Sequence, residues 1–133
     1  MRFLGAVPPD ELGPLYGHAL ACCIPSLTYE VFPTVALESL ARRTPIVAHD
    51  LGGLTEIVQD SGGGLLYRTD DELIAALHTM AADEGARRSM GDRGYGVVTD
   101  RWSKHAHVTR YLALLDAAAT RRDDAARSAH PVA

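Results

Sequence analysis

The sequence predicts an α/β fold in which helices cover both faces of a parallel sheet. Short, continuously apolar segments alternate with amphipathic segments along most of the chain. Apolar runs without polar alternation are typical of parallel strands buried on both faces, and strand–helix alternation is typical of parallel sheets. The 133 residues, 47% of them hydrophobic, are enough for one modest domain with a single core.

Strands are expected where a short apolar run is followed by a turn signal. These segments are residues 1–4, 21–24, 45–48 and 64–67. In the second of them, Cys22 and Cys23 are adjacent, and neighbouring strand residues point to opposite faces. We therefore expect two free thiols in a reducing compartment.

Helices are expected where apolar residues recur at helical spacing. These segments are residues 11–21, 34–43, 54–59, 70–82, 84–99 and 103–119. Asp10 is expected to cap the first helix, and Pro33 to lie at or just before the first turn of the second. Gly91, Gly94 and Gly96 are expected to interrupt the fifth. Residues 1–119 are then one domain, and the polar, Ala-rich residues 120–133 are expected to be a disordered tail.

Composition and charge argue against several function classes. A net charge of −4 gives no general electrostatic reason to bind nucleic acid or an anionic membrane. No apolar run is long enough to span a bilayer, and the N-terminus does not look like a signal peptide, so a cytoplasmic protein is expected. The six histidines are scattered, and no metal site or cofactor is expected.

In open parallel sheets, ligands bind beyond the carboxyl ends of the strands. Those ends are expected at residues 5–9, 25–33, 49–53 and near Tyr67. One of them carries the segment YEVFPTVALE, residues 29–38, in which two glutamates lie eight positions apart.

The helix after Pro33 offers an anion site, because its first-turn N–H groups have no acceptor within the helix. Ala36, Leu37, Leu40 and Ala41 are expected to form its buried stripe. Glu38 falls off that stripe on the same side as Thr34, and side chains lean toward the helix N-terminus. Glu30 precedes the helix at the same strand end. A diphosphate flanked by hydroxyl-rich sugars would suit two such carboxylates, since a carboxylate accepts two hydrogen bonds from a vicinal diol. The competing interpretation is a pair of solvated glutamates.

The surrounding residues resemble those of retaining, nucleotide-sugar-dependent glycosyltransferases of family 4, the group 1 type. The family pattern joins a strand ending in "flG", a helix with "LY..A", a "PS..E.F" segment and "LEA.A.G.PVVA...GG..E". The matching residues are Phe3-Leu4-Gly5, Leu15-Tyr16, Pro25-Ser26, Glu30-Val31-Phe32-Pro33, Leu37-Glu38-Ser39-Leu40-Ala41, Pro45-Ile46-Val47-Ala48 and Gly52-Gly53. The resemblance covers roughly residues 2 to 116 and implies a Rossmann-like domain, the incomplete C-terminal half of a GT-B enzyme that lacks its first strands.

The resemblance assigns a role to each matching residue. Glu30 would contact donor-sugar hydroxyls and support the transition state, and Glu38 would bind the ribose diol. The backbone of Phe32, Pro33, Thr34 and Val35 would hold the diphosphate. A proline replaces the family's glycine at position 33, as it also does in some family members.

Three further positions have two interpretations each. Val7 would lie near the nucleobase or be a plain apolar loop residue. Gly52 and Gly53 would let the ligand approach the backbone or only form a tight turn. His49 would contact the ligand or be a polar loop residue. A dinucleotide is not expected, because no GxGxxG follows the first strand.

The implied activity is transfer of a sugar from a UDP-, GDP- or ADP-sugar donor to an acceptor with retention of configuration and without a metal. The family enzymes have a second domain that binds the acceptor, so we expect a separate N-terminal-domain chain as a possible partner. The alternative is a non-catalytic nucleotide-sugar-binding remnant or a subunit of a split transferase.

Overall fold

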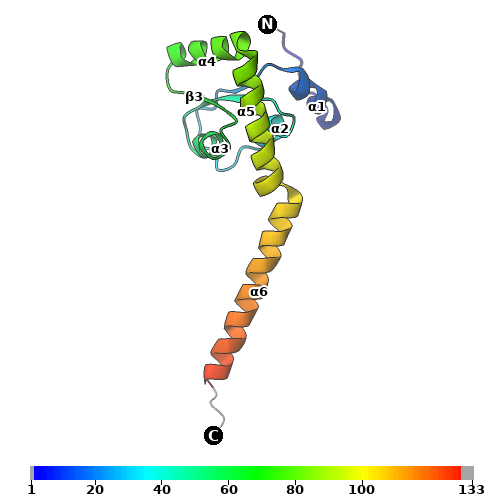
Figure 1. Ribbon diagram of the computed structural model, residues 1–133, viewed down its shortest axis with the longest axis vertical. Coiled ribbons are helices and arrows are strands. Elements are labelled where there is room, and N and C mark those ends of the chain that lie inside the picture. The colour runs from blue at the N-terminus through cyan, green and yellow to red at the C-terminus, as the bar shows by residue number, and fades with distance from the viewer. Residues whose placement is uncertain (1, 130–133) are drawn as a thin grey trace. The chain divides into compact units, whose positions relative to one another are not determined.

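The computed structural model describes residues 2–129, with side chains through residue 122. It divides into two units, Met1–Thr99 and Asp100–Ala133. The elements of the first unit are α1 (Pro9–His18), β1 (Cys22–Ile24), α2 (Thr34–Leu40), β2 (Ile46–His49), α3 (Gly53–Ser61), β3 (Gly64–Tyr67), α4 (Asp70–Ala82) and α5 (Glu84–Val97) (Figure 1).

The strands form a parallel sheet in the order β1-β2-β3. Cys23 pairs with Val47, and Val47 pairs with Leu65, so the central strand β2 is bonded on both sides. The parallel sheet with flanking helices confirms the predicted fold class. All three strands therefore end at one edge, where their following loops meet.

The core lies on both faces of β2, whose residues Ile46, Val47 and Ala48 are fully buried. Val47 packs with Tyr67 against the α4 side chains Ala76 and Met80. Because strand residues alternate between faces, Ile46 and Ala48 point to the opposite side, where α2 and α3 pack. The central strand is thus buried on both faces, as the sequence predicts, whereas β1 and β3 at the edges of the sheet are partly exposed.

The predicted strand at residues 1–4 is wrong. Among the described residues, 2–4 pair with no strand, and Phe3 is 84% exposed. A strand is stabilised by ladder hydrogen bonds, which these residues do not form. The first helix begins at Pro9, with Pro8 and not Asp10 as its N-cap. Proline is favoured at the first helical position because that position needs no N–H donor.

The predicted glycine interruptions of α5 are also wrong, because the helix is continuous through Val97. Gly91 and Gly94 are buried where α5 meets the end of α2 and the turn before β3. A Cβ at Gly91 would collide with the Arg43 carbonyl oxygen, and one at Gly94 would lie 2.5 Å from Leu40 Cδ2. These glycines permit close helix packing, which outweighs their low helix propensity.

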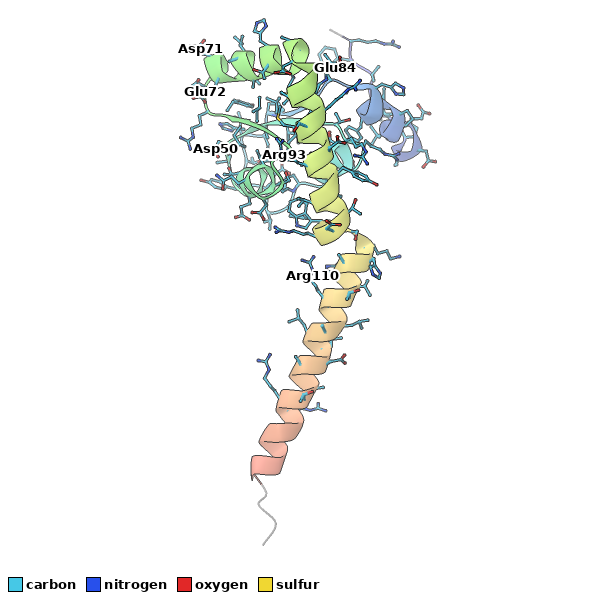
Figure 2. The ribbon with its side chains drawn as sticks, in the orientation of Figure 1. Asp50, Asp71, Glu72, Glu84, Arg93 and Arg110 are labelled. Atoms are coloured by element: carbon cyan, nitrogen blue, oxygen red, sulfur yellow. The ribbon has the colours of Figure 1, made fainter. Side chains whose placement is uncertain are left out.

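A π-helical turn, Val98–Trp102, follows α5, and α6 (Lys104–Ala129) belongs to the second unit. Within that unit the Arg110 side chain donates to the Arg101 carbonyl oxygen (Figure 2). α6 extends beyond the predicted 103–119, since Ala and Arg are strong helix formers. Residues 120–129 of the expected disordered tail are helical in the structure, and residues 130–133 lie outside the described residues. No helix in the described part of the chain has both the length and the apolar composition needed to cross a membrane.

Candidate donor site at the strand ends

The loop that carries Glu30 lies against the glycine turn that follows β2. The backbone N–H of Gly53 donates to the Glu30 carbonyl oxygen at 2.8 Å. Gly52 has a φ of +56°, which favours glycine, and a Cβ there would lie 3.1 Å from that same oxygen. A Cβ at Gly53 would collide with the carbonyl oxygen of Val31. The structure therefore brings three of the predicted site residues, Glu30, Gly52 and Gly53, to one place.

The chain turns into α2 immediately after this loop. Pro33 is buried as the N-cap residue, with a φ of −69°, and Thr34 opens the helix at the surface. Phe32 is half-exposed and Val35 is half-buried. The Ala36 N–H donates to the Pro33 carbonyl at 3.2 Å, so the first turn is already wound at the predicted position.

Glu38 lies on the exposed side of α2 and faces α1. Its Oε2 accepts a hydrogen bond from the Tyr16 hydroxyl at 3.3 Å. Both side chains line a cavity of about 310 Å³ between the two helices, together with Arg42. Burial, and then the nearby Cys22 and Glu38, raise the pKa of Tyr16, which keeps its hydroxyl a hydrogen-bond donor. The structure thus gives Glu38 different neighbours from those of Glu30.

The stripe predicted for α2 is correct in part. Ala36 and Leu40 are fully buried, and Leu37 is half-buried. Ala41 is exposed, because the helix ends at Leu40. The buried stripe instead includes Ser39, which is fully buried and whose hydroxyl donates to the Thr44 carbonyl at 2.9 Å.

Val7 is half-buried in the segment before α1. It lines a separate cavity of about 870 Å³, together with Leu4 and Leu15. The structure does not bring Val7 to the Glu30 loop, and its nucleobase role stays a prediction.

His49 ends β2 and contacts both neighbouring strand ends. Its Nδ1 lies 3.0 Å from the Ser26 carbonyl oxygen, and its ring stacks on Tyr67 with centroids 5.4 Å apart. Because a carbonyl oxygen only accepts, Nδ1 is the donor in this contact. His49 is therefore a structural link between loops.

Sequence reasoning missed the polar cluster beside this link. Asp50 Oδ1 accepts from Thr55 Oγ1 at 2.6 Å, and Asp50 Oδ2 accepts from Arg68 Nε at 2.7 Å. These two hydrogen bonds hold the pKa of Asp50 below its usual range, and the bond from Thr55 has the larger effect. Asp50 and Glu72, both labelled at the left of Figure 2, line one cavity of about 200 Å³. Asp50 and Arg68 both directly follow apolar strand segments, and that position was the signal available in the sequence.

The cysteines and the metal-binding residue types add no further chemistry. Both Cys22 and Cys23 are free, and burial raises the pKa of each thiol. Within the part of the chain that the structure describes, no three His, Cys, Asp or Glu side chains are grouped to hold a metal ion.

Residues 1–97 match the profile of the family described as "Glycosyl transferases group 1". The chain belongs to this family. Structural comparison agrees with this assignment. Sucrose-phosphate synthase from Thermosynechococcus elongatus, a GT-B enzyme, superposes on this chain with a TM-score of 0.76. That match has 30% sequence identity and covers 88% of this chain and 30% of the synthase chain.

Two curated relatives that the chain matches are also named as sugar transferases. A D-inositol 3-phosphate glycosyltransferase from Kribbella flavida is 41% identical over 92 residues, 68% of this chain and 22% of the relative. An MMP alpha-(1->4)-mannosyltransferase from Mycolicibacterium hassiacum is 35% identical over 115 residues, 84% of this chain and 28% of the relative. The matched part of the chain thus spans about a fifth to a quarter of the length of these relatives.

Proposed function

We propose that this chain supplies the nucleotide-sugar donor site of a retaining glycosyltransferase. The observation that carries the proposal is the Gly53–Glu30 hydrogen bond of 2.8 Å, which holds a half-buried glutamate at the edge where all three strands end. That edge is where ligands bind in open parallel sheets. Membership of the group 1 glycosyltransferases supports a sugar-transfer role for the site.

Glu38 is the proposed ligand of the ribose diol. Its carboxylate is exposed on α2 and borders the cavity of about 310 Å³ between α1 and α2. A carboxylate accepts one hydrogen bond at each oxygen from two neighbouring hydroxyls. Because Tyr16 donates to Oε2, the carboxylate already has a partner that orients it.

The diphosphate would lie at the first turn of α2, beside the backbone of residues 32–35. The N–H groups of Thr34 and Val35, which open α2, have no acceptor within the helix, and the helix dipole favours an anion there. As the sugar–phosphate bond breaks, negative charge builds on the diphosphate and positive charge on the sugar ring. Fixed N–H donors stabilise the negative charge on the diphosphate, and the carboxylate of Glu30 stabilises the positive charge on the sugar ring.

The donor would be a UDP-, GDP- or ADP-sugar, and the acceptor site would come from another domain or chain. The alternative is a non-catalytic nucleotide-sugar-binding remnant or a subunit of a split transferase. Adding a donor to the purified chain, with and without a candidate N-terminal-domain protein, separates the two. With an acceptor present, transfer by the chain alone supports the transferase, and transfer only with the added protein supports the split transferase. Donor binding without transfer in either mixture supports the remnant.

The two glutamates can be tested separately by calorimetric titration. Glu38→Ala should weaken binding of the free nucleotide roughly tenfold or more, the usual effect of losing hydrogen bonds to a charged group. Glu30→Ala should leave free-nucleotide affinity unchanged and weaken only the additional binding of the nucleotide sugar. Glu84→Ala is the matched control, since it removes an exposed carboxylate on α5. Unchanged nucleotide affinity in Glu38→Ala would contradict the ribose assignment.

A further inference from the structure

The turn after β2, residues 49–53, contacts the loops that follow both neighbouring strands. We propose that Asp50 is a positioning residue for Glu30: its carboxylate, bonded to Thr55 and Arg68, fixes the turn that holds the Glu30 loop at two points. The claim that Glu30 must be held in place rests on the proposed function. The claim that Asp50 fixes the turn does not.

The turn holds the Glu30 loop through backbone atoms. His49 Nδ1 donates to the Ser26 carbonyl at 3.0 Å, near the start of the loop. The Gly53 N–H donates to the Glu30 carbonyl at 2.8 Å, near its end. A Cβ atom added at Gly52 or Gly53 would come too close to the backbone of this loop. The turn therefore lies in van der Waals contact with the loop. A movement of the turn would therefore move the Glu30 backbone.

Asp50 fixes the turn from the other side. Its Oδ1 accepts from Thr55 Oγ1 at 2.6 Å, in the first turn of α3. Its Oδ2 accepts from Arg68 Nε at 2.7 Å and lies 2.6 Å from the second guanidinium nitrogen, Nη2. Its backbone N–H donates to the Tyr67 carbonyl at 2.9 Å. Charge-assisted hydrogen bonds of this kind are the strongest available to a side chain.

The Asp50 side chain is also shielded from solvent, which strengthens its hydrogen bonds. Its side chain is only 13% exposed, whereas that of Arg68 is 75% exposed. The Arg68 backbone N–H in turn donates to Glu72 Oε2 at 2.6 Å, which ties the loop after β3 to α4. The Glu30 loop is thus linked through the 49–53 turn to the start of α4. A functional side chain needs support of this kind, because a displacement of about 0.5 Å already matters.

Hydrogen exchange of the Gly53 amide tests the fixing of the turn without any ligand. In the full chain, Asp50→Ala should speed exchange of the Gly53 amide about tenfold more than exchange of the Asp83 amide, which bonds to the Thr79 carbonyl at the C-terminal end of α4. Arg68→Ala changes an exposed side chain and should act in the same direction, and Arg68→Lys should restore part of the protection. Asp92→Ala is the control, because it removes an exposed ion pair with Arg43.

Two results would overturn the fixing of the turn. One is unchanged Gly53 protection in both Asp50→Ala and Arg68→Ala. The other is an equal acceleration of all amides in residues 2–99, which would mean that Asp50 contributes only to global stability.

Ligand binding tests the step from the turn to Glu30. With the nucleotide series that the wild-type chain binds, Asp50→Ala should leave free-nucleotide affinity unchanged and reduce the additional affinity for the nucleotide sugar, as Glu30→Ala does. The double variant with Asp50→Ala and Glu30→Ala should lose no more affinity for the nucleotide sugar than Glu30→Ala alone, since both substitutions act through the Glu30 carboxylate. Additive losses would overturn the positioning role. If the wild-type chain binds no nucleotide, the proposed function fails, while the exchange measurement still decides whether Asp50 fixes the turn.

Discussion

The Gly53 amide and the Glu30 carbonyl oxygen are joined by a hydrogen bond of 2.8 Å, which connects the loop after β1 to the turn after β2. This contact uses only backbone atoms, so it requires a close approach of two chain segments. Glycine at position 53 makes the approach possible, because any Cβ there would meet the carbonyl oxygens of Val31 and Glu30.

Gly53→Ala should therefore destabilise the protein by roughly 1–3 kcal/mol, the usual cost of forcing an extra methyl group into a packed site. The change would be measured as the free energy of unfolding in urea. Gly17→Ala on α1 is the matched control, because a Cβ at Gly17 meets nothing within 4 Å. Equal stability of the two variants would show that the loop and the turn are not in close contact.

Two glycines of α5 should respond in opposite directions to the same substitution. Gly91→Ala should destabilise the protein by roughly 1–3 kcal/mol, since the added Cβ collides with the Arg43 carbonyl oxygen. Gly96→Ala should stabilise it by up to about 1 kcal/mol, because no atom lies near the added Cβ and alanine favours the helix. Thermal unfolding of the two variants would check the packing of α5, and a stabilising Gly91→Ala would contradict it.

The acid sensitivity of the protein should depend in part on Asp50. Hydrogen bonds from Thr55 and Arg68 lower the pKa of its carboxyl, and the nearby His49 acts in the same direction. Because the folded-state pKa lies below the unfolded value of about 3.9, the stabilisation is complete above that value and is lost as the pH falls through the folded pKa.

The stability difference between the wild type and Asp50→Asn should therefore be constant above about pH 5 and should narrow below about pH 4. Glu72 is a second carboxyl group next to Arg68, because it accepts a hydrogen bond from the Arg68 backbone. A Glu72→Gln background therefore isolates the Asp50 contribution. A stability difference that stays constant through the acid range would contradict the lowered pKa.

The sequence predicted the parallel sheet and most element positions because local signals agree there. Residues 64–67 and 70–82 match β3 and α4 at both ends, since a turn and the N-cap Thr69 mark their limits. Residues 1–4 are also largely apolar, but strand formation needs a neighbouring strand as well, which pattern alone does not reveal. The glycines of α5 were misjudged for the same reason, because the contacts that favour them come from distant residues such as Arg43 and Leu40.

The candidate site was predictable in its location and less so in its contacts. Glu30, Gly52 and Gly53 were expected at the strand ends and lie together there. Asp50 and Arg68 were not singled out, since an Asp in a turn and an Arg before a helix are common, and their ion pair depends on the register of β2 against β3.

Calorimetric titration of the purified chain with UDP, GDP and ADP, and with UDP-glucose and GDP-mannose, tests the donor-site proposal most directly. The account predicts saturable binding of one nucleotide series, with affinity reduced by Glu38→Ala but not by Glu84→Ala. The absence of binding to every one of these ligands, in a chain shown to be folded by circular dichroism, would contradict the claim that this chain holds the donor site.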